Sequence, residues 1–195
     1  MLALAALAAA LSITNIQPIA LHPGVNIVPN FTPEGAPVTI VQGWRGNGNA
    51  HSHAVWMVLA REAEGMAEGV IGLQPAQGPL HETIDDDPFD GERTLGVIRF
   101  ARARLDGAPA TILIDAHLDE APRGVLADHA TATITVYRLV RTDGAPGTTP
   151  LVFEPASVVH TTHRFCNVEP ALHEALGLPL SPDYGGANPV DGCAR

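Results

Sequence analysis

The sequence contains no lysine, so its eleven basic side chains are all arginine and stand against 21 carboxylates. The resulting formal charge of −10 argues against a nucleic-acid ligand and against binding to an anionic membrane surface. The lack of lysine also excludes a Ser-x-x-Lys catalytic motif, and no serine lies in a Gly-x-Ser-x-Gly motif. Neither a His-Glu-x-x-His motif nor a phosphate-binding loop is present. These absences favour a protein that is not an enzyme, and they leave a small molecule or another protein as its partner.

Cysteine is also scarce, with only Cys166 and Cys193 in the chain. An even pair with no cysteine left over is typical of an exported protein with one disulfide bond. Such a bond would close the tail into a loop and stabilise the fold by roughly 3–4 kcal/mol in the chain-entropy model. Two separate buried thiols are the alternative, whereas the spacing fits no zinc motif.

No apolar run approaches the roughly 20 residues that a membrane-spanning helix needs. The longest, Met1 to Leu11, consists of methionine, leucine and alanine only, which is typical of the apolar part of a signal peptide. A signal normally begins with a basic residue, and none is present, so a buried first strand remains the alternative. We therefore predict a signal-like segment at 1–11, a single domain at 12–195, and a periplasmic or secreted protein.

Short apolar segments separated by glycine and proline predict a chain made mainly of strands. The clearest alternation of apolar and polar residues covers 130–139. One helix is predicted at Val168 to Leu176, with Asn167 as its N-cap and Gly177 just past its end. The expected fold is an all-β antiparallel sandwich with this C-terminal helix and a disulfide-stapled tail, and a closed barrel is the alternative. The predicted strands are 12–21, 25–28, 38–44, 54–60, 68–73, 94–105, 110–118, 129–141, 151–153 and 158–164.

The glycine- and asparagine-rich turn at 46–49 joins two of these strands, and recognition chemistry gathers around it. Trp44 and Trp56 flank the turn, and each is either a core anchor or, if exposed, a contact for a ligand or partner. An acidic segment at 82–92 is either a solvated loop or a source of calcium ligands. No catalytic residue and no cofactor is predicted. The predicted binding residues are Trp44, Arg45, Asn47, Asn49, His51, His53, Glu82 and Asp85.

His51 and His53 also form a His-x-His pair, whose side chains would point the same way on a strand and could bind one metal ion. The alternative interpretation is that His51 and His53 are simply two polar residues beside a turn. The chain also lacks the glutamate that the cupin pattern requires after the second histidine. Further ligands would have to come from His81, His117, His129, His160 or His163.

Several short motifs of the mature chain occur together in a known family. With them, the chain resembles the small exported carbapenem self-resistance (CarG-like) proteins of antibiotic-producing bacteria. The resemblance implies a periplasmic β-sandwich that protects against a β-lactam without hydrolysing it, and it assigns no role to any residue. The motifs are Arg-Gly-Asn-Gly-Asn-Ala-His at 45–51, Glu-Thr-Ile-Asp at 82–85, Val-Ile-Arg-Phe-Ala-Arg at 97–102, Asp-Gly-Ala-Pro-Ala-Thr at 106–111, Leu-Gly-Leu-Pro-Leu at 176–180 and the tail at 188–193.

Three hypotheses follow from the sequence. The preferred one is an exported, non-enzymatic protein that binds a β-lactam or a cell-envelope protein. The second is a metal-dependent enzyme or metal-binding protein that uses His51 and His53. The third is a structural protein of the envelope that assembles through a sheet edge. The oligomeric state is open in all three.

Overall fold

The computed structural model describes residues 11–48, 52–61, 67–86, 94–119, 129–144 and 149–194. The signal-like segment, apart from Leu11, lies outside these residues, so its prediction is untested. None of the described residues belongs to a helix with the length and apolarity that crossing a bilayer requires. The elements are β1 (Ile13–Pro18), β2 (Gly24–Val28), β3 (Val38–Arg45), β4 (His53–Arg61), β5 (Glu68–Leu73), β6 (Ile84–Asp85), β7 (Gly96–Leu105), β8 (Ala108–Leu118), β9 (Ala132–Arg141), β10 (Leu151–His160) and α1 (Val168–Leu176).

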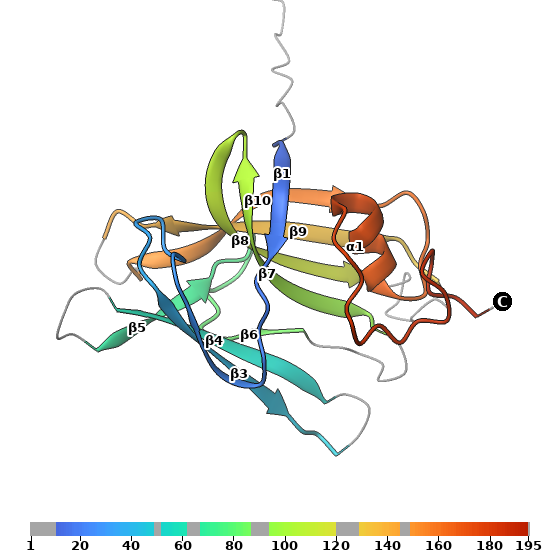
Figure 1. The fold of residues 1–195 in the computed structure, drawn as a ribbon, viewed down its shortest axis with the longest axis horizontal. Coiled ribbons are helices and arrows are strands. Elements are labelled where there is room, and N and C mark those ends of the chain that lie inside the picture. Colours follow the sequence, from blue (N-terminus) through green and yellow to red (C-terminus); the bar gives the residue numbers. More distant parts are fainter. Residues whose placement is uncertain are drawn as a thin grey trace, which may run out of the picture.

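The described strands form one continuous sheet in the order β1-β7-β8-β9-β10-β5-β4-β3-β2, with β6 paired to β4. The sheet curls into a half-barrel, and α1 packs on one side of it (Figure 1). The mainly β fold with one short helix is confirmed, but a sandwich of two separate sheets is not. The antiparallel prediction is wrong at one pair: β10 runs parallel to β5, with Val152 opposite Gly72. This pair joins the β2–β5 half of the sheet to the β7–β10 half.

The central strands β7, β8 and β9 contribute apolar side chains to a core on each of their two faces. One face contributes to the core between the two halves of the curled sheet, around Phe31, Phe100 and Phe153. The other face contributes to a second core, in which Ile114 and Ile134 belong to the same cluster as apolar residues of α1. Two cores on one sheet fix the inward and outward register of every central strand, because a slip by one residue would exchange them.

Local sequence signals account for most element boundaries. Asp106 and Gly107 take positive φ angles of 48° and 81° in the tight turn between β7 and β8, as their Asp-Gly sequence predicts. The predicted helix is confirmed from Val168 to Leu176. The side chain of Asn167 caps its first turn by accepting a hydrogen bond from the Glu169 N–H at 2.9 Å.

The region 151–164 differs from the prediction. A single strand, β10, runs from Leu151 to His160 where two shorter strands were expected. Pro155 lies within this strand although it cannot donate a hydrogen bond to a neighbouring strand. The sheet accommodates it with a shift in register between Pro155 and Ser157, so that pairing with β9 continues on both sides.

The C-terminal tail is held against α1 by covalent and polar contacts. Cys166 and Cys193 form the predicted disulfide. The Cys166 N–H also donates to the Asp191 carbonyl at 2.8 Å, and the Ser181 N–H donates to the buried Glu169 carboxylate at 2.9 Å. That carboxylate is also paired with Arg99 of β7, so the tail, the helix and the sheet meet at one ion pair.

Candidate functional site

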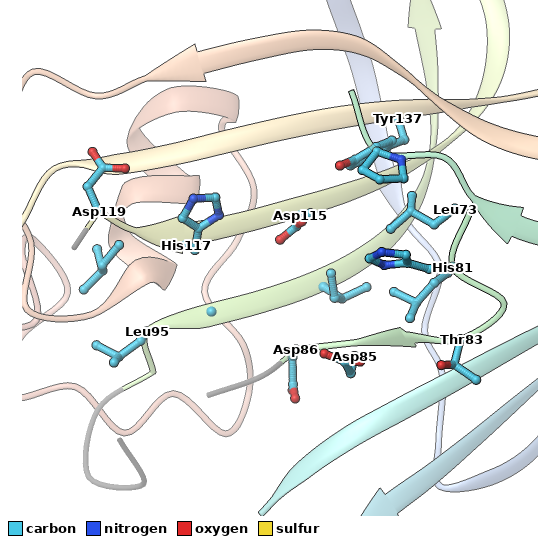
Figure 2. Close-up of a pocket in the computed structure, with 15 residues that line it drawn as sticks. Leu73, His81, Thr83, Asp85, Asp86, Leu95, Asp115, His117, Asp119 and Tyr137 are labelled. Carbon is cyan, nitrogen blue, oxygen red and sulfur yellow. The ribbon is translucent and has the colours of Figure 1, made fainter. Parts of the chain in front are cut away.

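A cleft of about 560 Å³ lies between β6 and the central strands β7, β8 and β9 (Figure 2). Its volume is in the range of small-molecule sites. Apolar and acidic residues share its walls, and no arginine is among its described lining residues. Those residues are Leu73, Pro75, His81, Thr83, Ile84, Asp85, Asp86, Leu95, Gly96, Ile98, Asp115, His117, Leu118, Asp119 and Tyr137.

Strand β8 supplies the polar wall through the alternation of its side chains. Residues at intervals of two point to the same face of a strand. Leu113 belongs to the core on that face, and Asp115, His117 and then Asp119 just beyond the strand follow it into the cleft. The cleft therefore continues the apolar core of the half-barrel, at the point where leucine gives way to charged and polar side chains.

Asp115 occupies an unusual position in this wall. It lies between the buried residues Ile114 and Ala116 and is itself half-buried, with its carboxylate directed into the cleft (Figure 2). Burial raises the pKa of this carboxyl above its ordinary value, while His117 lowers it and Asp85 raises it further. Among the described residues, nothing forms a hydrogen bond or ion pair with this carboxylate. A half-buried carboxylate that faces a cleft and has no protein partner is a candidate for a functional role.

Tyr137 stands diagonally across from Asp115 on the neighbouring strand. Leu113 is its direct cross-strand partner, which places the tyrosine on the cleft face of β9. The side chain is 6% exposed, and its hydroxyl has no hydrogen-bond partner among the described residues. Burial, and then the charge of Asp115, raise the pKa of Tyr137, so the phenol stays neutral at physiological pH. Its O–H is available to a molecule in the cleft.

The other two inner carboxylates already have partners. Asp119 accepts hydrogen bonds from the hydroxyls of Thr131 and Thr133, both at 2.6 Å. These bonds outweigh the opposing effect of burial, so the pKa of Asp119 is lowered. Asp86 accepts a hydrogen bond from the Ala54 N–H at 3.0 Å, yet burial still raises its pKa.

The opposite wall depends on two close backbone approaches. The main chain of His81 exchanges two hydrogen bonds of 2.8 Å with Leu73, which fixes the loop after β5 beside the cleft. At Gly96, a Cβ atom would lie 2.5 Å from the carbonyl oxygen of Asp86. Only glycine allows the segment after β6 to lie this close to the start of β7.

The structure brings few of the predicted binding residues together. Asp85 lines the cleft, whereas Glu82 is exposed outside it. Trp44, Arg45 and Asn47 are exposed at the end of the β3–β4 hairpin and do not line the cleft. Asn49 and His51 lie outside the described residues, and so does most of the acidic segment after Asp86.

The two tryptophans have different environments. Trp56 is 6% exposed and packs edge-to-face against Phe100, so it is a core anchor. Trp44 is 69% exposed and is therefore not a core anchor, and its role as a contact for a ligand or partner stays a prediction.

The histidines do not assemble into a metal site in the described part of the chain. His53 is buried at 7% exposure on β4, outside the cleft. His81 and His117, two of the proposed further ligands, both line the cleft. Within the described ranges, no three His, Cys, Asp or Glu side chains are placed to hold a metal ion.

Asp115 and Tyr137 are not among the binding residues that the sequence predicts. The signal for Asp115 is visible afterwards as a single carboxylate inside the apolar run Ile-Leu-Ile-Asp-Ala. The run lies in β8, which has at least two strands on each side of it in the sheet. An apolar run in such a central strand is expected to be buried on both faces, so a charged residue within it needs a structural explanation. Tyr137 gives no such signal, because a tyrosine in a strand usually reflects packing.

A second cavity, of about 460 Å³, lies between the β1–β2 connection and the tail. Its charged lining residues are Arg99, Glu169 and Asp183. Arg99 and Glu169 form an ion pair, and the Ser181 N–H donates to the other carboxylate oxygen of Glu169. The cleft beside Asp115 is the stronger candidate, because polar groups there lack protein partners.

Comparisons with known proteins define the fold and no more. No protein-family model matches the chain, and no curated protein matches it. A solved structure of CarG is similar, with a TM-score of 0.64 and 16% sequence identity. The similarity covers 82% of this chain and 95% of the CarG chain. At this identity it shows that the chain has a CarG-like fold.

Proposed function

We propose that this chain is an exported binding protein that takes a β-lactam into the cleft without hydrolysing it. The observation that supports the proposal most directly is the cleft itself, with Asp115 and Tyr137 lining it and unpartnered in the described chain. The CarG-like fold agrees with the resemblance that the sequence motifs indicated. That resemblance implies protection against a carbapenem.

Binding without hydrolysis is favoured by the side chains that line the cleft. Opening a β-lactam ring by acyl transfer needs a nucleophile beside a general base. No serine or cysteine is among the described lining residues. The polar groups present are carboxylates, imidazoles, a phenol and the hydroxyl of Thr83. No described residue forms a hydrogen bond that would activate Thr83 as a nucleophile, and all of these groups can bind and orient a ligand through hydrogen bonds.

Export is supported by the disulfide, because such bonds persist in oxidising compartments. In the periplasm, a protein of this kind would meet β-lactams before they reach their targets. The signal-like segment at the start of the chain provides the expected route.

Isothermal titration of the purified protein with a carbapenem tests the proposal. We expect saturable binding, with the intact carbapenem recovered by mass spectrometry after the complex is denatured. If the titration gives no heat of binding and the NMR spectra of the protein are also unchanged by the carbapenem, binding is refuted. Recovery of a ring-opened product at a rate that scales with protein concentration would refute the non-enzymatic part.

A second candidate partner, a cell-envelope protein, is favoured by the exposed Trp44 beside Arg45. Aromatic and arginine side chains contribute disproportionately to protein interfaces. On this alternative, Trp44→Ala abolishes co-purification with an envelope protein while carbapenem binding persists. Unchanged co-purification would exclude the hairpin end as the contact.

A further inference from the structure

We infer that the ligand of the cleft carries a protonated nitrogen, an ammonium, amidinium or guanidinium group, which binds Asp115 beside the hydroxyl of Tyr137. This inference rests on the proposed function, since it specifies the chemistry of the molecule bound at the same site. It concerns only the charge and hydrogen-bonding capacity of that molecule.

The charge of the cleft is the first argument. Four aspartates and two histidines line it, and none of its described lining residues is an arginine. The chain has no lysine that could neutralise them. The nearby Arg99 is engaged by Glu169, which belongs to the second cavity. An anionic group placed at Asp115 would therefore meet like charges and a cationic group opposite ones, so a carbapenem would direct its basic side chain, and not its carboxylate, toward Asp115.

The distribution of hydrogen bonds is the second argument. Asp119 is satisfied by two threonine hydroxyls and Asp86 by a backbone N–H, so these two carboxylates are held in place by the protein. Asp115 has no such partner in the described chain, although it is less exposed than His117, the next residue of β8 that lines the cleft. A cationic N–H donor supplies what the folded protein lacks at this atom.

The hydroxyl of Tyr137 indicates a polar ligand group independently of the carboxylates. Tyr137 is more than nine-tenths buried, lines the cleft, and has no hydrogen-bond partner for its hydroxyl among the described residues. A buried tyrosine usually finds a partner for this group. A ligand that bridges Asp115 and Tyr137 needs a donor for the carboxylate and a second polar atom for the phenol. An amidinium or guanidinium provides two N–H groups side by side.

The apolar walls define the rest of the molecule. Leu73, Leu95 and Ile98 are buried residues that line the same cleft, and Pro75 lies beside them. These residues favour an aliphatic or aromatic group attached to the cationic nitrogen. The expected ligand is thus an amphiphilic organic cation, and a free inorganic cation would leave the apolar walls uncovered.

The test uses three probes with one ring and different charge: benzamidinium, benzamide and benzoate. Each is titrated into the wild-type protein with detection by NMR chemical shifts. We expect benzamidinium to bind in the cleft at least about tenfold more tightly than benzamide, as a charge-assisted hydrogen bond contributes. Benzoate is expected to bind most weakly. Equal affinities, or preference for benzoate, would overturn the inference.

Variants locate the interaction. Asp115→Asn keeps the shape of the side chain and is expected to weaken benzamidinium by about tenfold or more, with little effect on benzamide. Tyr137→Phe is expected to weaken the binding of benzamidinium and of benzamide, each by a smaller factor than Asp115→Asn weakens benzamidinium. Glu154→Gln is the matched control, because it removes one negative charge at an exposed position of β10 outside the cleft. Equal losses in Asp115→Asn and Glu154→Gln would show a general charge effect and overturn the assignment.

A parallel titration separates this inference from the proposed function. It compares a carbapenem that has a basic side chain with one that lacks it. Preferential, Asp115-dependent binding of the basic carbapenem supports both. Binding of benzamidinium with no binding of either carbapenem supports the inference and refutes the β-lactam function. Equal binding of both carbapenems, unchanged by Asp115→Asn, supports the function and refutes the inference.

Discussion

Removing the bond between Cys166 and Cys193 gives a prediction whose size follows from the topology of the tail. The double variant Cys166→Ser/Cys193→Ser keeps nearly the same volume at both positions. The backbone contact from Cys166 to Asp191 and the hydrogen bonds of Asn188 with Asp191 remain available. The principal change is therefore in the unfolded chain, which gains the freedom that the crosslink had removed.

The two cysteines are 27 residues apart in the sequence. The chain-entropy relation gives about 3.6 kcal/mol at 25 °C for a loop of this length. For a domain of this size, each kcal/mol corresponds to roughly 2–4 °C in Tm, so the melting temperature is expected to fall by about 7–14 °C. Such a loss is within the usual stability of a folded domain, and the variant is expected to remain folded at 25 °C.

Urea and thermal unfolding, followed by circular dichroism, measure this change. The control is reducing agent, which should lower the Tm of the wild type and leave that of the double variant unchanged. Carbapenem affinity is expected to be preserved, because α1 packs on the sheet face opposite the cleft. A loss of stability below about 1 kcal/mol would contradict the loop-entropy argument.

Three further predictions address the core and the cleft. Phe153→Ala, in the centre of the aromatic core, is expected to destabilise the fold by about 3–5 kcal/mol in urea unfolding, and a loss under 1 kcal/mol would contradict its central role. Gly96→Ala places a methyl group against the Asp86 carbonyl and is expected to cost about 1–3 kcal/mol and to weaken ligand binding, whereas unchanged binding would show that the segment shifts freely. Because the folded-state pKa of Asp115 is raised, this group destabilises the fold once pH rises above its unfolded pKa. Asp115→Asn should therefore raise Tm at pH 7 and lose this advantage as the pH falls below about 4, and a gain that is independent of pH would contradict the burial of a charge.

The local structure was predictable because short-range chemistry dominates it. The Asp106-Gly107 turn, the N-cap at Asn167 and the alternation in β9 all agree with the structure. Each depends on the intrinsic conformational preference of a few neighbouring residues. Cys166 and Cys193 were predictable as a pair because no other cysteine competes for either.

The pairing of strands that lie far apart in the sequence could not be predicted from local patterns. The parallel pairing of β10 with β5 joins residues about two-fifths of the chain apart, and no local pattern encodes it. The register shift that keeps Pro155 within one strand depends on the partner strand β9.

The candidate site was predictable only in part. The turn after Trp44 attracted attention because glycine, asparagine and aromatic residues gather there in the sequence. The cleft instead combines residues from separate elements, of which Asp85 alone was among the predicted binding residues. The alternation that brings Asp115 to the cleft is a local property, but the wall that faces it is placed by the curl of the whole sheet.

Binding of a small molecule in the cleft beside Asp115 and Tyr137 is best examined in a crystal structure of the protein soaked or co-crystallised with a basic carbapenem. We expect the intact molecule in the cleft, with its cationic nitrogen against the Asp115 carboxylate and a polar atom at the Tyr137 hydroxyl. A carbapenem bound elsewhere while the cleft contains only water would contradict this expectation.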